Sequence, residues 1–224
     1  MARKTEEITG RLAKMPTAIL ADALEALSLP DAAMSHPIRC LAGERFAGRA
    51  RTLQKVPLPT NAGHAEIAPQ TGNLLYELID DCRDGEVLVL AVGGELRSAN
   101  FGGNMAERAA ILGVAAVVTD GALRDIGDFR NLGLTAFAAA SSPMSSRGKF
   151  ATIAADVPVQ CGGVRVCPGD YIAGDADGVI VIGPAHIEAV LDACDRFLGK
   201  DAAIRNELAS GETLVTAMRR HPKR

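Results

Sequence analysis

The amino-acid sequence predicts an α/β fold centred on a parallel sheet. The main observation is a near-continuous apolar run at 86–92, because such a run is typical of a strand buried on both faces. An Ala-rich helical segment follows at 105–112, and two further apolar runs occupy 114–118 and 134–138. Strands that alternate with helical segments at this spacing indicate βαβ units, whose strands pair in parallel.

Three further elements are predicted ahead of this centre, namely a helix at 19–27, a strand at 47–56 and a short helix at 73–79. Thr17 precedes the first helix and is its expected N-cap. The stretch at 57–71 has no clear period, and it holds His64 and Glu66. Loops of this kind are usually solvated, so we expect these two side chains in a solvated loop.

The C-terminal part is predicted to hold short strands and one or two closing helices, at 157–159, 164–166, 171–173, 177–182 and 186–218. In the centre, Gly113 is expected to end the helix, and Asp120-Gly121 is expected to end the second strand. No internal repeat and no low-complexity linker divides the sequence. We therefore expect a single domain over 1–224.

Composition excludes several functional classes. The 24 basic and 27 acidic residues give a net charge of −3, which does not favour a nucleic-acid-binding surface. No segment approaches the roughly 20 apolar residues needed to span a bilayer, and the N-terminus lacks the apolar run of a signal peptide. The five cysteines form no CxxC pair, which argues against a disulfide framework or a structural zinc site. We expect a cytoplasmic protein.

Two segments beyond the predicted parallel strands carry groups suited to one chemistry. Gly102-Gly103-Asn104-Met105 begins a helix, where free amides and the helix dipole attract anions. Arg124 and Asp125 follow the next strand. Ligands of open α/β sheets bind beyond the carboxyl ends of the strands, so both segments are expected to face one crevice.

The residue types in this crevice predict binding of a 2-oxo acid beside a metal ion. Arg124 can hold a carboxylate bidentately, together with the helix amides. Asp125 is a hard oxygen ligand suited to Mg²⁺ or Mn²⁺. Such an ion stabilises an enolate as a Lewis acid, which is the requirement of aldol cleavage and of decarboxylation of 3-carboxy-2-oxo acids. An Arg-Asp dipeptide alone is a weak signal, because it is more often a surface ion pair.

Much of the sequence resembles the RraA-like family, which includes class II 4-hydroxy-4-methyl-2-oxoglutarate aldolases and the regulator of ribonuclease activity A. The segments that carry the resemblance are 21–24, 47–52, 84–89, 102–106, 113–125, 157–164, 168–170 and 175–179. The resemblance implies a swivelling β/β/α domain with a central parallel-rich sheet and flanking helices. It also implies a homotrimer or a dimer of trimers, with a C-terminal helix at about 184–218 packing on a neighbouring subunit.

The resemblance assigns roles to individual residues. The segment Gly102, Gly103, Asn104 and Met105 would bind the 2-oxo acid with Arg124, and Asp125 would bind the divalent metal. A carboxylate from a neighbouring subunit would complete the catalytic set, with Asp201 as the best match and Glu207 as the second choice. The aldolases often carry an acid where this sequence has Gly103, whereas Asp128 keeps the usual acid of its position.

The expected activity is cleavage of a 4-hydroxy-2-oxo diacid to pyruvate, decarboxylation of oxaloacetate, or both. The alternative is a non-enzymatic regulator that binds RNase E, with a vestigial site. Retention of Arg124, Asp125 and Asp128 argues against a vestigial site. A methyltransferase function is the least supported hypothesis, because Gly93-Gly94 lacks the rest of a nucleotide-binding glycine motif.

Overall fold

The computed structural model describes residues 2–35, 37–58 and 73–222, so His64 and Glu66 lie outside the described residues. The helices are α1 (Ala2–Leu12), α2 (Thr17–Ala26), α3 (Leu74–Asp80), α4 (Gly103–Ile111), α5 (Ile126–Leu132), α6 (Ile187–Ala209) and α7 (Leu214–Arg220). The strands are β1 (Arg39–Ala42), β2 (Phe46–Pro57), β3 (Glu86–Ala91), β4 (Ala116–Leu123), β5 (Thr135–Ser141), β6 (Phe150–Ala155), β7 (Val159–Cys161), β8 (Val164–Val166), β9 (Tyr171–Asp175) and β10 (Gly178–Ile182).

A mixed eight-stranded sheet forms the centre of the molecule. Its strand order is β1-β5-β4-β3-β2-β9-β10, and β6 pairs with β2 off this path. The four strands β2, β3, β4 and β5 run in parallel, whereas β1, β6, β9 and β10 pair antiparallel. The predicted α/β class with a parallel centre and flanking helices is therefore confirmed.

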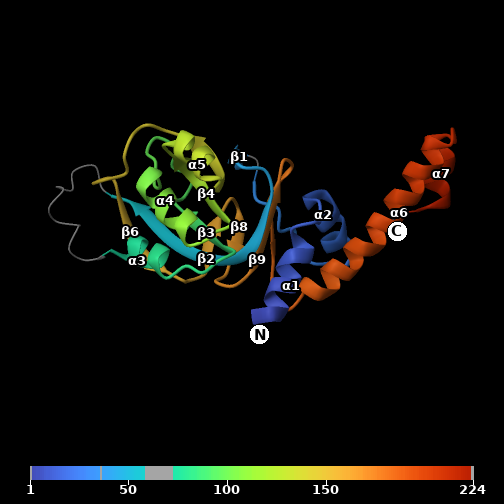
Figure 1. Ribbon diagram of the computed structural model, residues 1–224, viewed down its shortest axis with the longest axis horizontal. Coiled ribbons are helices and arrows are strands. Elements are labelled where there is room, and N and C mark those ends of the chain that lie inside the picture. The colour runs from blue at the N-terminus through green and yellow to red at the C-terminus, as the bar shows by residue number, and fades with distance from the viewer. Residues whose placement is uncertain (1, 36, 59–72, 223–224) are drawn as a thin grey trace.

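Three apolar clusters hold together the sheet and the helices that pack on it, whose arrangement is drawn in Figure 1. Helices α3, α4 and α5 cover one face of the parallel strands, where Leu88 and Leu90 of β3 point. On the other face, Val87 and Val89 pack toward the small β7-β8 sheet. Helices α1, α2 and α6 enclose the third cluster against β9 and β10. Because β3 is buried on both faces, the side chains of its apolar run divide between two clusters.

Two details of the sequence-based prediction are wrong. Strand β4 does not end at Asp120-Gly121 but continues to Leu123, with an irregular register between Thr119 and Ala122. The turn-forming pair is accommodated as a bulge inside the strand. Thr17 is the first residue of α2 rather than its N-cap. Its amide and its hydroxyl both donate to the carboxylate of Asp175, so a distant side chain binds this helix start.

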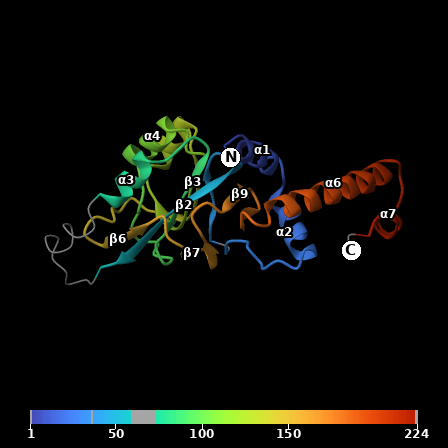
Figure 2. The same cartoon turned by 90° about the horizontal axis from the view of Figure 1, so that it is seen from below.

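The C-terminal helices leave the body of the molecule. The N-terminal half of α6 packs on α1 and α2, and the rest projects outward and carries α7 at its far end (Figure 2). Exposed apolar side chains occur on this projecting part, at Leu208, Leu214, Val215 and Met218. No helix in the described part of the chain is long and apolar enough to cross a membrane.

Lys55 is a buried cation near the carboxyl end of β2. It is only 6% exposed, and no hydrogen-bond or ion-pair partner for its amine occurs within the described ranges. By the period of two along the strand, Lys55 faces the same side of the sheet as the buried Leu53. Burial lowers the pKa of Lys55 to about 8 from its ordinary value of 10.5. An unpaired buried amine of this kind destabilises the fold at neutral pH.

We expect Lys55→Met to raise the free energy of unfolding at pH 7 by about 1–3 kcal/mol, because each unit of pKa shift is worth about 1.4 kcal/mol. The folded state of the wild type has the lower pKa, so the unfolded state binds more protons between about pH 8 and pH 10.5. The free energy of unfolding of the wild type therefore rises with pH across that window because of Lys55, whereas the variant has no such contribution. Urea unfolding of both proteins at pH 7 and pH 9.5 measures the effect; a variant less stable than wild type at both pH values would contradict it.

Candidate functional site

The loop that follows β3 is held against β4 by a half-buried carboxylate. Asp120 accepts hydrogen bonds from the amides of Val92 and Gly94, at 2.8 and 3.2 Å. Burial raises the pKa of Asp120 above its ordinary value. The neighbouring Gly121 is required by space, since a Cβ there would stand 2.2 Å from a methyl carbon of Val92. These contacts fix where the chain leaves β3.

Beyond this turn, residues 98–101 run alongside the end of β4. The amide of Asn100 donates to the carbonyl of Ala122 at 3.0 Å, and the amide of Arg124 donates to the carbonyl of Phe101 at 3.1 Å. Strand β3 pairs with the first half of β4, and this segment pairs with the same edge of β4 near the end of the strand. As a result, the start of α4 lies directly beside the end of β4.

This arrangement brings Arg124 and Asp125 to the N-terminus of α4, as the sequence predicted. The amide of Gly103 donates to Oδ2 of Asp125 at 2.9 Å. Nε of Arg124 lies 3.4 Å from the same oxygen. Both side chains remain partly exposed, at 41% and 43%. The second oxygen of Asp125, Oδ1, has no partner in the described part of the chain and remains available to a ligand.

Asp125 has an unusual backbone conformation. It lies in the left-handed region, with φ 57° and ψ 41°, at the position that precedes α5. A non-glycine residue in this region costs about 1–2 kcal/mol. The conformation turns the Asp125 carboxylate away from its own helix, which it does not cap, and toward Gly103. Strained residues held in place by their surroundings occur frequently at functional sites.

Gly102 leaves space for this pair of side chains. A Cβ at this position would lie 2.8 Å from Oδ2 of Asp125 and 2.9 Å from Cγ and Nε of Arg124. The backbone of Gly102 is extended and would accept any residue. The presence of glycine at position 102 is therefore explained by close packing against Arg124 and Asp125 rather than by a turn.

Only part of the predicted amide group is free to bind an anion. The Gly103 amide is taken by Asp125, and the Met105 amide donates to the carbonyl of Gly102 at 3.0 Å. The amides of Gly102 and Asn104 have no protein partner among the described residues. The site therefore offers two amides, rather than a full set of four, together with the Arg124 guanidinium.

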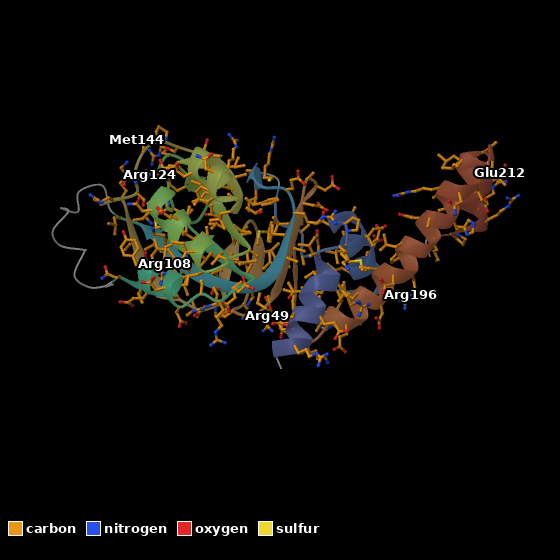
Figure 3. All side chains as sticks on the ribbon, in the orientation of Figure 1. Arg49, Arg108, Arg124, Met144, Arg196 and Glu212 are labelled. Carbon is orange, nitrogen blue, oxygen red and sulfur yellow. The ribbon has the colours of Figure 1, made fainter. Side chains whose placement is uncertain are left out.

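The two candidate carboxylates of the C-terminal helix do not reach this site within one chain. Arg124 lies at one end of the molecule, whereas Arg196 and Glu212, which bracket Asp201 and Glu207 in sequence, lie toward the other end (Figure 3). Glu207 is engaged by His221 at 2.9 Å and by Arg220 at 3.4 Å. The hydrogen bond from His221 lowers the pKa of Glu207 below its ordinary value. Asp201 has no such partner among the residues that the structure describes.

The structure also brings the loop after β5 against the segment that leads to α4, a contact that the sequence did not single out. The Ala99 amide donates to the carbonyl of Met144 at 2.7 Å. Nζ of Lys149 lies 3.2 Å from Oγ of Ser98. These residues come from the loop after β5, and no periodic signal in the sequence could have placed that loop. Glu95 and Arg97 pair with each other at the surface.

Comparisons with known proteins agree with this architecture. A relative from Thermus thermophilus, named 4-hydroxy-4-methyl-2-oxoglutarate aldolase, is 35% identical over 140 residues, which cover 62% of this chain and 76% of that protein. The RNA-processing inhibitor RraA of Thermus thermophilus superposes with a TM-score of 0.57 at 33% identity, covering 72% of this chain and 91% of the other.

A Streptomyces coelicolor structure, described as an unusual member of the RNase ES inhibitor RraA family, gives a TM-score of 0.75 at 25% identity. It covers 92% of this chain and 96% of its own. The family model for RraA-like proteins, described as Aldolase/RraA, matches residues 17–181 and so includes the whole Gly102–Arg124–Asp125 site. The chain therefore belongs to the RraA-like family.

Proposed function

We propose that this protein is a divalent-metal-dependent carbon–carbon lyase that acts on small 2-oxo acids. The observation that carries the proposal is the convergence of Arg124, Asp125 and the N-terminus of α4 on one point, through the Gly103–Asp125 hydrogen bond of 2.9 Å. Relatives named as 4-hydroxy-4-methyl-2-oxoglutarate aldolases support the same class of reaction.

Each group of the site has a distinct part in this proposal. The Arg124 guanidinium and the free amides of Gly102 and Asn104 hold the carboxylate of the 2-oxo acid. Oδ1 of Asp125 is a hard oxygen donor, and Gly103 and Arg124 orient this carboxylate through its other oxygen. Mg²⁺ keeps several waters and needs only one or two carboxylates, so the donor set fits such an ion.

No group of three or more His, Cys, Asp or Glu side chains suited to a metal occurs in the described ranges. This finding agrees with a hydrated ion held by few protein ligands rather than a closed structural site. When bound, Mg²⁺ or Mn²⁺ supplies Lewis-acid stabilisation of an enolate. Arg124 adds positive charge beside the substrate carboxylate.

Two reactions give the same enolate. In aldol cleavage of 4-hydroxy-4-methyl-2-oxoglutarate, the C3–C4 bond breaks and its electrons form the enolate of pyruvate. The 4-hydroxyl loses its proton, and that half of the substrate becomes a second pyruvate. In oxaloacetate decarboxylation, loss of CO₂ leaves the same enolate. In both cases C3 then takes a proton.

We assign the remaining acid–base role to Asp201 of the partner subunit. Within one chain, α6 projects away from the site and exposes apolar side chains near its end (Figure 1). Exposed apolar patches of this kind are typical of protein interfaces. A trimer, or a dimer of trimers, would let each C-terminal helix pack on a neighbour and deliver Asp201 to the neighbour's Arg124 and Asp125.

The first test is pyruvate release from oxaloacetate and from 4-hydroxy-4-methyl-2-oxoglutarate with added Mg²⁺, measured by coupling to lactate dehydrogenase. We expect Asp125→Asn and Arg124→Met each to lower kcat/KM about 100-fold or more, as the loss of one preorganised charged group usually does. Arg147→Met, at an exposed arginine, is the matched control and should keep wild-type activity. An inactive wild type, or full activity in Asp125→Asn, would overturn the proposal.

Mixing two inactive variants tests whether sites are shared between subunits. Asp125→Asn and Asp201→Asn should each be inactive alone. After joint refolding in equal amounts, about one quarter of the sites in a randomly assembled trimer would combine an intact Asp125 with an intact Asp201 of a neighbour. Recovery of activity near that fraction is the expected result. No recovery, in a mixture shown by light scattering to form mixed oligomers, would remove Asp201 from the site.

A non-enzymatic regulator is the second candidate, because one similar structure is described as the RNA-processing inhibitor RraA and another as an unusual member of the RNase ES inhibitor RraA family. In this case the protein would bind an RNase E scaffold region through its surface, and the variants Asp125→Asn and Arg124→Met would bind like wild type. Biolayer interferometry against that region decides the matter. Absence of binding at micromolar protein would remove this candidate, whereas tight binding by a protein that releases no pyruvate would favour it over the lyase.

A further inference from the structure

A large cavity lies at the end of the parallel strands opposite to the candidate site. Its volume is about 880 Å³, within the usual range for cavities that bind small molecules. Helix α1 forms one wall, at Thr9, and the start of β2 and the turn before β3 form the other. Arg49 of β2 pairs in register with Glu86, the first residue of β3, whereas Arg124 follows the last residue of β4. Figure 3 shows the two arginines well apart.

The guanidinium of Arg49 lines this cavity and is held in one place without an ion pair. Its Cζ lies 4.9 Å from the centroid of the Tyr171 ring, in a cation–π contact. A Cβ at Gly169 would stand 2.6 Å from Nη2 of Arg49, so glycine leaves the space that the guanidinium needs. The Gly169 amide donates to the carbonyl of Ala50 at 2.8 Å, which fixes this loop against β2. The position of the guanidinium is therefore set before any ligand arrives.

Arg49 has no hydrogen-bond or ion-pair partner within the described ranges. Its Nε is a buried donor, and the side chain as a whole is half-buried. The carboxylate of the nearby Asp170 accepts from the Cys167 amide at 2.7 Å instead. A partly desolvated charge without a partner is costly to the fold. Because Nε is covered, the two Nη groups are the donors that remain, and they can hold a carboxylate bidentately.

The charges around the cavity restrict the class of ligand. Three arginines and four acids line it, so the lining carries one net negative charge. A simple anion would satisfy Arg49 but would add to this excess of negative charge. A ligand that carries an ammonium group together with its carboxylate would satisfy both requirements. The arginines are Arg49, Arg51 and Arg83, and the acids are Glu6, Asp84, Glu86 and Asp156.

Two of the four acids are available to an ammonium group. Glu86 and Asp156 both contact Arg51, at 3.3 and 2.8 Å. Glu6 on α1 and Asp84 in the turn before β3 have no such partner in the part of the chain that the structure describes. The unpaired cation and the two unpaired acids thus come from three separate segments that meet around one cavity.

We propose that this cavity binds a free amino acid, with its carboxylate on Arg49 and its ammonium group beside Glu6 and Asp84. Such a ligand would join α1 to β2 and would leave the net charge of the lining unchanged. It would also stabilise the folded protein, because it binds the folded chain and not the unfolded one. The site is separate from the one described above, and the proposal does not depend on the lyase function.

The experiment measures thermal unfolding of the whole protein with each standard amino acid at millimolar concentration, followed by calorimetry for those that raise Tm. We expect at least one amino acid to bind with a Kd below about 1 mM. Its counterpart without the amino group, such as glutarate for glutamate or 4-methylpentanoate for leucine, should bind about 10-fold more weakly or less, since it brings no ammonium group to the acids.

Three variants test the two halves of the site. Arg49→Met should weaken binding about 10-fold or more, the usual cost of losing a charged hydrogen-bond donor. Glu6→Gln combined with Asp84→Asn should bring the amino acid and its counterpart without the amino group to similar affinities. Arg147→Met, at an exposed arginine away from the cavity, is the matched control and should bind like wild type. Circular dichroism establishes that each variant is folded.

Four outcomes would overturn the proposal. In the first, no amino acid binds wild type at millimolar concentration. In the second, wild type binds the counterpart without the amino group equally well, so the cavity is a site for simple anions. In the third, an amino acid binds Arg49→Met as tightly as wild type and therefore lies elsewhere. In the fourth, Arg49→Met changes the oligomeric state in light scattering and wild type binds no amino acid, so that Arg49 contacts a second copy. Pyruvate release by Arg49→Met should equal that of wild type, which keeps this test apart from that of the lyase.

Discussion

The geometry of the candidate site depends on the half-buried carboxylate of Asp120. It receives the amides of Val92 and Gly94, and so it ties the turn after β3 to the bulge in β4. With that turn fixed, residues 98–101 can run beside the end of β4 and deliver α4 to Arg124. Loss of this acid would be costly, because it would leave the amides of Val92 and Gly94 without their hydrogen-bond partner.

Close packing of backbone and charged side chains characterises the site. Position 102 has no room for a Cβ because Arg124 and Asp125 lie against it, and a Cβ at position 103 would meet the end of the Asp128 side chain. Asp125 adopts a left-handed backbone conformation so that its carboxylate meets the Gly103 amide. The left-handed conformation of Asp125 raises the energy of the folded state locally. Such costs are tolerated at functional sites when the surrounding core, here the cluster around Phe101 and Phe129, is well packed.

The shape of the chain separates two parts of the proposed machinery. Arg124 and Asp125 lie on the compact α/β body, whereas Asp201 lies on a helix that projects from the opposite end (Figure 2). A single copy cannot bring these residues together. Assembly would place them in contact and would also cover the apolar side chains near the end of α6, so one association would satisfy two requirements.

The sequence alone determined the α/β class, the parallel order of the central strands and the identity of the residues that meet at the site. It succeeded because the apolar runs at 86–92 and 134–138 are long enough to define buried strands, and because glycines mark the turns between elements. The expectation that Gly102 and Arg124 lie close together followed from a general property of parallel sheets, and the structure confirms this proximity.

Tertiary structure decided what local pattern cannot encode. Asp120-Gly121 has the composition of a turn, yet it lies within β4 because Asp120 binds amides 26 and 28 residues away along the chain. Thr17 looks like an N-cap, yet it donates hydrogen bonds to Asp175, which belongs to strand β9 far along the chain. In both cases a contact between distant segments outweighs the local propensity.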